Sequence, residues 1–461
     1  MGQAHRFHPT ILREYDIRGI VGETLGPDDA RAIGRAYGTM LKERGGARVC
    51  VGRDGRLSSP ELAEALIQGL VGTGLAVQAV GLGPTPMLYF AVHHLDADGG
   101  IQVTGSHNPP SHNGFKMMLG KGSLYGDAIQ RLGALAASGR MAQGAGRVEQ
   151  VDVFGAYVDR LAGDFTGSRA VDAVWDAGNG AAGPAMLALA ARLPGRHECL
   201  FAEVDGRFPN HHPDPTVPEN LVDLIREVTA GGFEAGIGFD GDGDRIGVVD
   251  GKGRIVWGDQ ILLILAGEIL RRLPGSTIIS DVKASQILFD EIGRLGGVPL
   301  MWKTGHSLIK AKMAEIGSPL SGEMSGHIFY KDRFYGHDDA LYVAVRLLSI
   351  LAGGDRTLAD LRDAMPPSFT TPEVRFDCDE AVKFKAIEQV KANLEAAGAD
   401  FDGIDGVRVL EPDGWWLLRA SNTQAVIVAR CESRSDEGLG RLKERVRFEL
   451  RRVGVEPPAG F

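Results

Sequence analysis

One pattern recurs three times along the chain and restricts its fold more than any other feature. An apolar run closes on an aspartate, and a loop of small residues and a helical stretch follow it. The closing aspartates are Asp54, Asp176 and Asp281. Because strands that alternate with helices form parallel sheets with helices on their faces, the pattern predicts an α/β fold. Its repetition indicates three related α/β domains with mixed sheets.

The first repeat shows the pattern in most detail. Residues 48–52 have the composition of a buried strand, and Ser58 or Ser59 is expected to cap a helix whose first position is Pro60. A second strand and helix follow, and a third strand at 100–103 leads into a loop at Thr104. In such sheets, ligands bind at the loops that follow the strand C-termini. The loop at Thr104 is therefore a candidate functional site.

The chain changes character after Pro366-Pro367, which is expected to be a linker. From residue 369 onward the predicted order is strand, helix, hairpin and helix, with Glu-Pro-Asp-Gly at 411–414 as a turn. This order describes a smaller α+β domain. The predicted domains are residues 1–150, 151–253, 254–366 and 367–461.

Composition and charge exclude several classes of protein. The net charge of −10 argues against a broad nucleic-acid interface. The four cysteines form no CxxC pair, so neither a disulfide framework nor a zinc site is expected. The longest apolar run, residues 261–266, is too short to span a bilayer, and residues 1–10 lack the apolar core of a signal peptide. We expect a cytoplasmic protein without nucleic-acid or membrane partners.

The densest chemical motif is Asp240-Gly-Asp-Gly-Asp-Arg245, which lies between two predicted strands. Its three carboxylates can converge around a cation because the intervening glycines let the backbone curl, and oxygen ligands suit Mg²⁺ or Ca²⁺. An EF-hand is excluded, since its sixth position should be glycine and is Arg245, and its twelfth should be glutamate and is Gly251. The motif indicates a metal loop, with a solvated acidic turn as the alternative.

Three further loops carry polar side chains. Thr104-Gly-Ser-His-Asn-Pro-Pro110 would present Ser106 as a nucleophile or phosphoryl carrier. Gly-Glu-Met-Ser-Gly-His at 322–327 has a carboxylate, Glu323, that can accept hydrogen bonds from two adjacent sugar hydroxyls. Arg-Ala-Ser-Asn-Thr at 419–423 combines a planar cation with hydroxyls and exposed amides, which suits phosphate. Each loop alone is also compatible with an ordinary turn.

Other motifs imitate familiar sites. Gly178-Asn-Gly-Ala-Ala-Gly183 follows a predicted strand and has the glycine spacing of a dinucleotide-binding loop, a pattern common in glycine-rich chains. No P-loop motif is present in the sequence, which disfavours a P-loop NTPase. His211-His212 lies among prolines and is expected to be a surface loop rather than a metal site.

Taken together, these segments resemble the α-D-phosphohexomutase family. The loops at 104–110, 240–245, 322–327 and 419–423 are similar to its phosphoserine, metal, sugar-recognition and phosphate-binding loops, and they follow one another in the family's order. The closest similarity is to the bacterial phosphomannomutase/phosphoglucomutase branch. The resemblance implies four domains around one central cleft and reversible transfer of a phosphoryl group between the 1- and 6-positions of mannose or glucose phosphates. A hexose 1,6-bisphosphate would be the intermediate and activator.

The resemblance also implies roles for particular residues. Ser106 would carry the phosphoryl group, and one Mg²⁺ would bridge Ser106 to Asp240, Asp242 and Asp244. The implied catalytic residues are Ser106, His107, Lys116, Arg245, His306 and Arg18. The implied substrate-binding residues are Tyr15, Lys283, Glu323, Ser325, His327, Arg419, Ser421, Asn422 and Thr423. Which of Lys116, His306 and His107 acts as general base stays open.

Two alternative functions compete with this one. A phosphoglucosamine mutase has the same chemistry, but that relative has glutamine where this chain has Met324. A non-catalytic protein that binds a metal or a sugar phosphate would not need Ser106 and all three aspartates together. The expected partner is a phosphosugar, and a monomer is expected, with a dimer as the alternative. Closure by the last domain, hinged near Pro366-Pro367, is expected to retain the bisphosphate.

Overall fold

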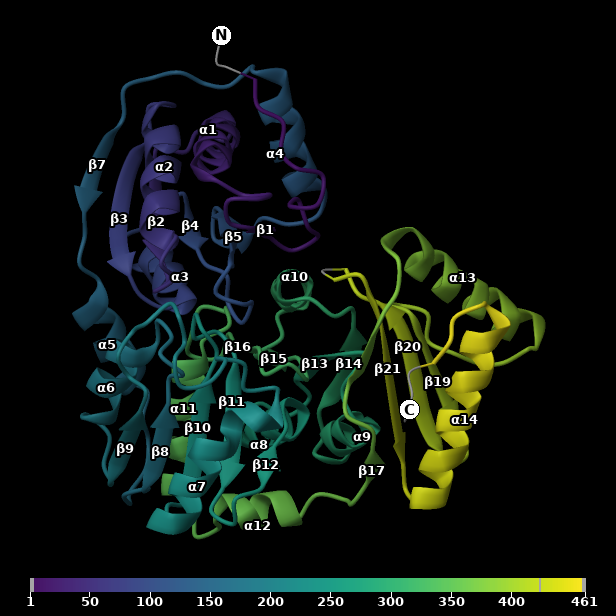
Figure 1. The fold of residues 1–461 in the computed structure, drawn as a ribbon. Coiled ribbons are helices and arrows are strands. Elements are labelled where there is room, and N and C mark those ends of the chain that lie inside the picture. Colours follow the sequence, from purple (N-terminus) through teal and green to yellow (C-terminus); the bar gives the residue numbers. More distant parts are fainter. Residues whose placement is uncertain (1–3, 423, 458–461) are drawn as a thin grey trace.

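The computed structural model describes residues 4–422 and 424–457. Within these residues the strands form four sheets, and each sheet belongs to one consecutive part of the chain (Figure 1). None of the described helices combines the length and hydrophobicity that crossing a bilayer requires.

The first domain contains a seven-stranded mixed sheet in the order β1-β5-β4-β2-β3-β7, with β6 paired to β5. Strands β4, β2, β3 and β7 are parallel, whereas β5 runs antiparallel to β4 and to β1. Its elements are β1 (Ile17–Ile20), α1 (Pro27–Glu43), β2 (Arg48–Arg53), α2 (Ser59–Val71), β3 (Ala76–Leu82), α3 (Thr85–His94), β4 (Gly99–Val103), β5 (His112–Leu119), β6 (Gly122–Ser123), α4 (Asp127–Ser138) and β7 (Arg147–Gln150).

One local expectation in this domain needs correction. Ser58 occupies the N-cap of α2, but its side chain makes no capping hydrogen bond. The hydroxyl of Ser59 instead donates to Asp54 Oδ1 at 2.5 Å. Pro60 does lie in the first turn, and Leu62, Leu66 and Leu70 are buried, as helical spacing predicts.

The second and third domains repeat this construction with fewer strands. The second sheet has the order β12-β11-β10-β8-β9 and the third has the order β14-β13-β15-β16. The second domain contains α5 (Phe154–Ala162), β8 (Ala173–Asp176), α6 (Gly183–Ala190), β9 (His197–Leu200), η1 (Pro218–Leu221), α7 (Val222–Gly231), β10 (Ala235–Phe239), β11 (Ile246–Asp250) and β12 (Ile255–Val256). The third contains α8 (Gly258–Arg272), β13 (Thr277–Asp281), α9 (Gln286–Arg294), β14 (Val298–Trp302), α10 (His306–Ile316), β15 (Leu320–Gly322), β16 (Ile328–Tyr330), α11 (Ala340–Ala352) and α12 (Leu358–Asp363).

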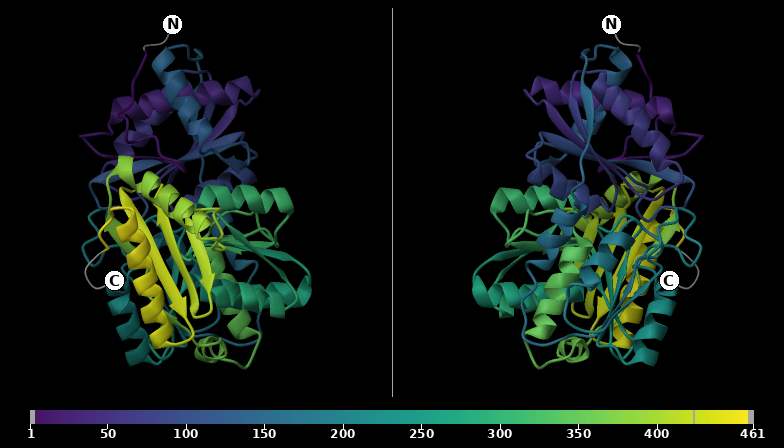
Figure 2. Two further views of the ribbon diagram at one scale, coloured as in Figure 1. Left: turned by 90° about the vertical axis from the view of Figure 1, so that its right-hand side faces the viewer. Right: turned by 90° about the vertical axis from the view of Figure 1, so that its left-hand side faces the viewer.

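The last domain is an antiparallel sheet with two helices on one face (Figure 2). Its elements are β17 (Phe369–Thr370), β18 (Val374–Asp377), α13 (Glu380–Ala396), β19 (Val407–Glu411), β20 (Gly414–Ala420), β21 (Val426–Ser433) and α14 (Asp436–Arg452). Both faces of β20 are covered, because Trp416 and Leu418 pack in the core with the helices while Trp415 and Leu417 contact Val282 of the third domain. Because successive side chains of β20 point to opposite faces of the sheet, one set packs against the helices and the other forms the interface between the third and fourth domains.

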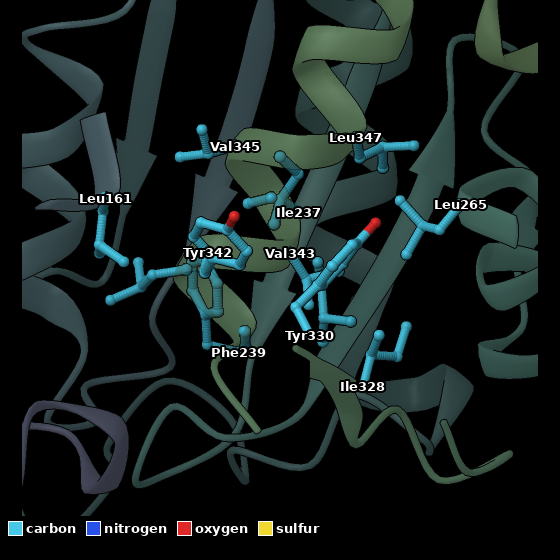
Figure 3. Close-up of a cluster of buried hydrophobic side chains, with 14 of the residues drawn as sticks. Leu161, Ile237, Phe239, Leu265, Ile328, Tyr330, Tyr342, Val343, Val345 and Leu347 are labelled. Carbon is cyan, nitrogen blue, oxygen red and sulfur yellow. The ribbon is translucent and has the colours of Figure 1, made fainter. Parts of the chain in front are cut away.

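The second and third domains share a core. Figure 3 shows Ile237 and Phe239 of β10 beside Tyr330 of β16 and Tyr342 of α11. Nearly every residue of α11 is buried, which follows from its almost uninterrupted apolar sequence, Ala-Leu-Tyr-Val-Ala-Val-Arg-Leu-Leu. The expected fold, three related α/β domains and a smaller α+β domain, is confirmed.

Candidate active site

A cavity of about 290 Å³ lies where the four domains meet. It is lined mainly by polar and charged side chains, and each domain contributes some of them. The lining residues include Tyr15, Arg18, His107, Arg245, Lys283, His306, Glu323, Ser325, His327, Arg419, Ser421 and Asn422. Sequence positions separated by most of the chain thus face one small volume, and this volume is the predicted central cleft.

The four predicted functional loops share one construction. Each joins a strand to an antiparallel neighbour in the same sheet: β4 to β5, β10 to β11, β15 to β16 and β20 to β21. Such a loop turns back at the end of its sheet, so its side chains project beyond the strands. The repeated fold therefore brings one functional loop per domain to the cavity.

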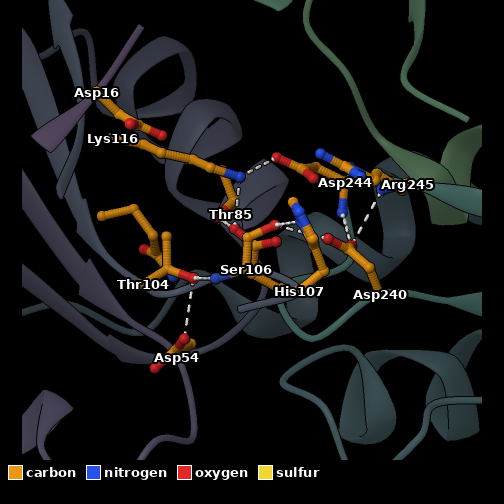
Figure 4. Close-up of polar contacts among 12 residues, drawn as sticks. Asp16, Asp54, Thr85, Thr104, Ser106, His107, Lys116, Asp240, Asp244 and Arg245 are labelled. Carbon is orange, nitrogen blue, oxygen red and sulfur yellow. Dashed lines mark hydrogen bonds and ion pairs between the residues drawn. The ribbon is translucent and has the colours of Figure 1, made fainter. Parts of the chain in front are cut away.

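Ser106 is held in a rare backbone conformation. Its φ is +49°, in the left-handed region that residues other than glycine seldom adopt. The Oγ donates to Asp240 Oδ2 at 2.7 Å and lies 3.2 Å from His107 Nδ1 (Figure 4). Burial, followed by the charge of Arg245, holds the pKa of His107 well below its usual range. A neutral imidazole therefore lies beside a hydroxyl that faces the metal loop.

The carboxylates of Asp240, Asp242 and Asp244 are fully buried, and ligand atoms of all three lie within 4.8 Å of one another. Burial, followed by the charges of the other two aspartates, raises the pKa of Asp240 well above its usual value. Within the described part of the chain, Asp242 Oδ1 and Asp244 Oδ1 have no hydrogen-bond partner. Converging, unsatisfied carboxylate oxygens fit a hard divalent cation such as Mg²⁺.

Lys116 of β5 partly balances this negative charge. Its Nζ donates to Asp242 Oδ2 at 2.8 Å and to Asp244 Oδ2 at 2.5 Å (Figure 4). Burial alone would lower the pKa of Lys116, but the surrounding aspartates outweigh burial and raise it. Lys116 is therefore protonated in this arrangement, which makes it a cation and a proton donor rather than a base.

Arg245 connects the metal loop to the sugar loop. Its Nε donates to His327 Nε2 at 3.0 Å, so the proton of that imidazole lies on Nδ1. His327 Nδ1 lies 2.9 Å from Asp338 Oδ2, and Lys310 Nζ donates to Asp338 Oδ1 at 3.0 Å. Asp338 and Lys310 were not predicted from the sequence, because neither lies in a functional loop.

Glu323 and His306 form another part of the wall. The Oε1 of Glu323 accepts the backbone N–H of Gly305 at 2.6 Å, and burial is the main cause of its raised pKa. The His306 ring stacks on His327 with centroids 5.5 Å apart. Burial lowers the pKa of His306 well below its usual value, and its Nε2 has no hydrogen-bond partner among the described residues. His306 is thus a neutral group that can exchange a proton with a ligand.

The remaining predicted residues line the side of the cavity nearer the last domain. Arg419 is held by Asp405, with Nε 3.1 Å from Oδ2. Asn422 Nδ2 donates to the hydroxyl of Tyr15 at 2.8 Å, a contact between the last and first domains. Lys283 Nζ donates to Glu373 Oε2 at 2.9 Å. Thr423, which the sequence also predicted here, lies outside the described residues.

Arg18 faces the cavity from β1, where its Nε donates to Asp16 Oδ2 at 2.7 Å. Ser106, Lys116 and the three aspartates are not among the lining residues and lie buried behind the wall formed by His107 and Arg245. The structure therefore collects all described predicted residues into two adjoining layers, a cavity wall and a charged cluster beneath it.

Two residues that contact the Ser106 loop were not predicted to belong to the site. Arg56 is almost fully buried against the loop, although an arginine in Gly52-Arg-Asp-Gly-Arg56 would ordinarily be assigned to the surface. His212 lies in a loop and is partly exposed, and its Nε2 lies 2.5 Å from the carbonyl oxygen of His107, a contact that the sequence did not predict. A signal for Arg56 was its position after a strand that ends at the same sheet edge as β4.

Comparison with known proteins agrees with this geometry. Family models for phosphoglucomutase/phosphomannomutase match in order along the chain: alpha/beta/alpha domain I at residues 9–139, domain II at 155–253, domain III at 257–369 and the C-terminal domain at 373–448.

Relatives match over nearly the whole chain. A phosphomannomutase/phosphoglucomutase of Pseudomonas aeruginosa is 46% identical over 98% of each chain. One from Pseudomonas putida is 47% identical over 97% of this chain and 96% of its own. The crystal structure of a phosphoglucomutase/phosphomannomutase family protein from Burkholderia thailandensis is 46% identical and superimposes with a TM-score of 0.92, covering 97% of this chain and 98% of that one. The chain therefore belongs to the phosphoglucomutase/phosphomannomutase family of α-D-phosphohexomutases.

Proposed function

We propose that this chain interconverts the 1- and 6-phosphates of mannose and glucose by reversible phosphoryl transfer through Ser106. The observation that carries the proposal is the position of Ser106 Oγ, 2.7 Å from Asp240 Oδ2, beneath a cavity that the sugar and phosphate loops also line. A nucleophilic hydroxyl, an acidic cluster and two ligand-recognition loops are the parts that such a transfer needs.

The proposed reaction starts from phosphorylated Ser106. The 6-hydroxyl oxygen of a hexose 1-phosphate bonds to the phosphorus as the bond from phosphorus to Ser106 Oγ breaks. The hydroxyl proton passes to a base, and Ser106 Oγ takes up a proton that it gives back in the second transfer. The resulting 1,6-bisphosphate reorients in the cavity. Ser106 Oγ then bonds to the phosphorus at C1, the bond from that phosphorus to O1 breaks, and O1 takes up a proton. The 6-phosphate leaves, and Ser106 is phosphorylated again.

The site supports the following charge and proton roles. Asp240, Asp242, Asp244 and Ser106 would hold Mg²⁺, which when bound neutralises negative charge on the transferring oxygens. Lys116 and Arg245 add positive charge beside them. Burial lowers the pKa of His107 and His306, so both imidazoles are neutral, and these two rings are the candidate acceptors of the hydroxyl proton.

Substrate recognition uses the other two loops. Glu323, Ser325 and His327 would bind the sugar hydroxyls, and Arg419, Ser421, Asn422 and Thr423 would hold the phosphate that does not react. Tyr15, Arg18 and Lys283 complete the wall. Because the 3- and 4-hydroxyls are shared by glucose and mannose, contacts to them would admit both sugars. Binding the remote phosphate positions the reacting one.

Phosphorus NMR tests the proposal. Purified protein with Mg²⁺ and a trace of glucose 1,6-bisphosphate should convert glucose 1-phosphate and mannose 1-phosphate to their 6-phosphates. Ser106→Ala should abolish conversion, whereas Ser111→Ala, an exposed serine in the same loop, should retain it. Conversion of neither sugar by the unaltered protein would overturn the proposal, and glucosamine phosphate would then be tried.

A further inference from the structure

The loop that carries Ser106 is held by the carbonyl groups of its own backbone. Arg56, only 1% exposed, directs its guanidinium into the curve of this loop. One terminal nitrogen donates to the carbonyl oxygens of Pro109 at 2.6 Å and His112 at 3.0 Å. The other donates to those of Ser106 at 2.7 Å and Asn108 at 2.5 Å. A single guanidinium thus binds four acceptors of one loop.

The carbonyl group of His107 is not bound by Arg56, and a residue of another domain binds it instead. His212 lies in the second domain, between β9 and η1, and its Nε2 is 2.5 Å from the carbonyl oxygen of His107. A carbonyl oxygen only accepts, so Nε2 is the protonated ring nitrogen. Every carbonyl from residue 106 to residue 109 therefore accepts a hydrogen bond from either Arg56 or His212.

Asp54 binds hydrogen-bond donors of the same loop. Its Oδ2 accepts the hydroxyl of Thr104 at 2.9 Å and the backbone N–H of Gly105 at 3.1 Å (Figure 4). It also lies 3.2 Å from Arg56 Nε. The N–H of Ser106 donates to Thr104 Oγ1 at 2.9 Å. The donors of Thr104 and Gly105 are thus bound by the carboxylate of Asp54, whereas the carbonyls of residues 106–109 are bound by Arg56 and His212.

Packing leaves this arrangement little freedom. A Cβ at Gly105 would lie 2.4 Å from Arg56 Nε, so only glycine fits against the guanidinium. The ring of Phe208, from the second domain, lies 5.3 Å from Arg56 Cζ. Because Arg56 is only 1% exposed, its hydrogen bonds to the loop carbonyls lie away from solvent, which strengthens each of them.

We propose that Arg56 and His212 are positioning residues for phosphoryl transfer, and that they keep Ser106 in its left-handed conformation so that Oγ faces the metal loop. The inference rests on the proposed role of Ser106 as phosphoryl carrier. Neither residue lines the cavity, and the guanidinium of Arg56 and Nε2 of His212 bind loop carbonyls instead of facing the substrate volume. Their loss should misplace the reacting serine while leaving the sugar and phosphate loops intact, and kcat should fall without a change in KM.

Matched variants test this inference. His212→Gln can still donate one hydrogen bond to the carbonyl of His107, whereas His212→Phe keeps the ring volume without a donor. Arg56→Lys keeps the charge but replaces a planar fork by a single ammonium. Arg346→Lys is the control, because Arg346 is similarly buried and lies in α11 away from the loop. Glucose 1-phosphate conversion and hydrogen exchange of the 104–114 peptide are measured for each.

We expect Arg56→Lys to lower kcat about 100-fold, as a misplacement of about 1 Å does, and His212→Phe to lower it by a smaller factor. KM should not change, His212→Gln should restore kcat, and exchange in the 104–114 peptide should accelerate in the two impaired variants only. Wild-type kcat and exchange in His212→Phe would overturn the inference, as would equal losses in His212→Phe and His212→Gln. The His212 pair decides the matter if Arg56→Lys does not fold.

Failure of the proposed function gives a different result. If the unaltered protein converts no hexose phosphate, the role of Ser106 is wrong, and the positioning inference falls with it even where the exchange measurement still detects the loop contacts. If the unaltered protein is active and the folded variants match it, only the positioning inference is wrong.

Discussion

At the scale of single residues, the buried charges beneath the cavity are the most sensitive feature of the molecule. Lys116 is 3% exposed and binds two carboxylates that are fully buried. Removing one partner of a buried ion pair leaves the other charge uncompensated, which costs about 3–5 kcal/mol. Lys116 is therefore expected to contribute to stability as well as to chemistry.

Lys116→Met tests this expectation. In metal-free buffer the variant should lose about 3 kcal/mol of unfolding free energy, and Mg²⁺ should restore more of it than it adds to the wild type, because a cation then replaces the missing ammonium. Urea unfolding with and without Mg²⁺ measures both. Arg207→Met, an exposed cation paired to Asp205, is the control and should change little. Equal Mg²⁺ effects on variant and wild type would contradict the expectation.

Asp339 gives a pH dependence of stability. Burial raises the pKa of its carboxyl to about 7, against hydrogen bonds from Tyr342 N and the Tyr157 hydroxyl that lower it. The folded state then binds the proton more tightly than the unfolded state. The contribution of this carboxyl to the unfolding free energy is therefore full below about pH 4 and declines as the pH rises to about 7. Its total is about 4 kcal/mol, at 1.36 kcal/mol for each pKa unit.

Asp339→Asn should remove this decline, because an amide does not titrate, and it can still accept the hydrogen bond that caps α11. The measurement is the unfolding free energy of both proteins from pH 4 to pH 8. Asp400→Asn, at an exposed position, should keep the wild-type slope. Parallel curves for wild type and Asp339→Asn would show that Asp339 does not titrate in this range.

At the scale of secondary-structure elements, α11 joins the cores of the second and third domains. Leu347 is fully buried there, beside Ile237 of β10 and Leu265 of α8 in one cluster (Figure 3). Leu347→Ala should cost about 2–5 kcal/mol, the range for a buried leucine. Leu187→Ala in α6, where the side chain is 49% exposed, should cost far less.

The shared helix also predicts how the domains unfold. Hydrogen exchange should show β10 of the second domain and β16 of the third weakened together in Leu347→Ala, because both strands pack against the same helix. Weakening of β16 alone would mean that the two domains are independent stability units.

The same scale explains what the sequence could predict. Apolar runs of strand length ending in Asp54, Asp176 and Asp281 identify parallel strands, and a polar motif after such a strand locates a functional loop. Ser106, Asp240 and Glu323 could therefore be found, whereas Arg419 was found from the polar loop between two strands of the last domain. The position of Arg56 after β2 placed it near the site, but its burial could not be predicted, because it depends on carbonyls that a distant loop supplies and sequence patterns assign arginine to the surface.

At the scale of the whole molecule, the contacts between domains were the least predictable part of the site. Tyr15 and Asn422 come from opposite ends of the chain, yet they share a hydrogen bond across the cavity. His212 likewise contacts the loop that carries Ser106 from another domain. Such pairs depend on how four sheets are placed relative to one another, which no local periodicity encodes.

We predict that the last domain closes over the cavity. It joins the third domain through the exposed Pro366-Pro367 segment and meets the first domain through Asn422 and Tyr15. The Tyr15 hydroxyl also donates to the carbonyl of Thr304 at 2.6 Å, so one phenol connects three domains at the mouth of the site. The last domain also packs on the third domain through Trp415 and Leu417 at Val282, and we expect it to move as a unit over this interface.

Tyr15→Phe removes both hydrogen bonds while keeping the ring, and it should shift the free protein toward an open form. Solution scattering should give a larger radius of gyration for Tyr15→Phe than for wild type without ligand, and glucose 1,6-bisphosphate should compact both. Tyr125→Phe, a tyrosine outside this cavity, should scatter like wild type. If wild type shows no compaction with the bisphosphate, the last domain does not close, and retention of the reorienting intermediate must come from contacts already present in the four loops.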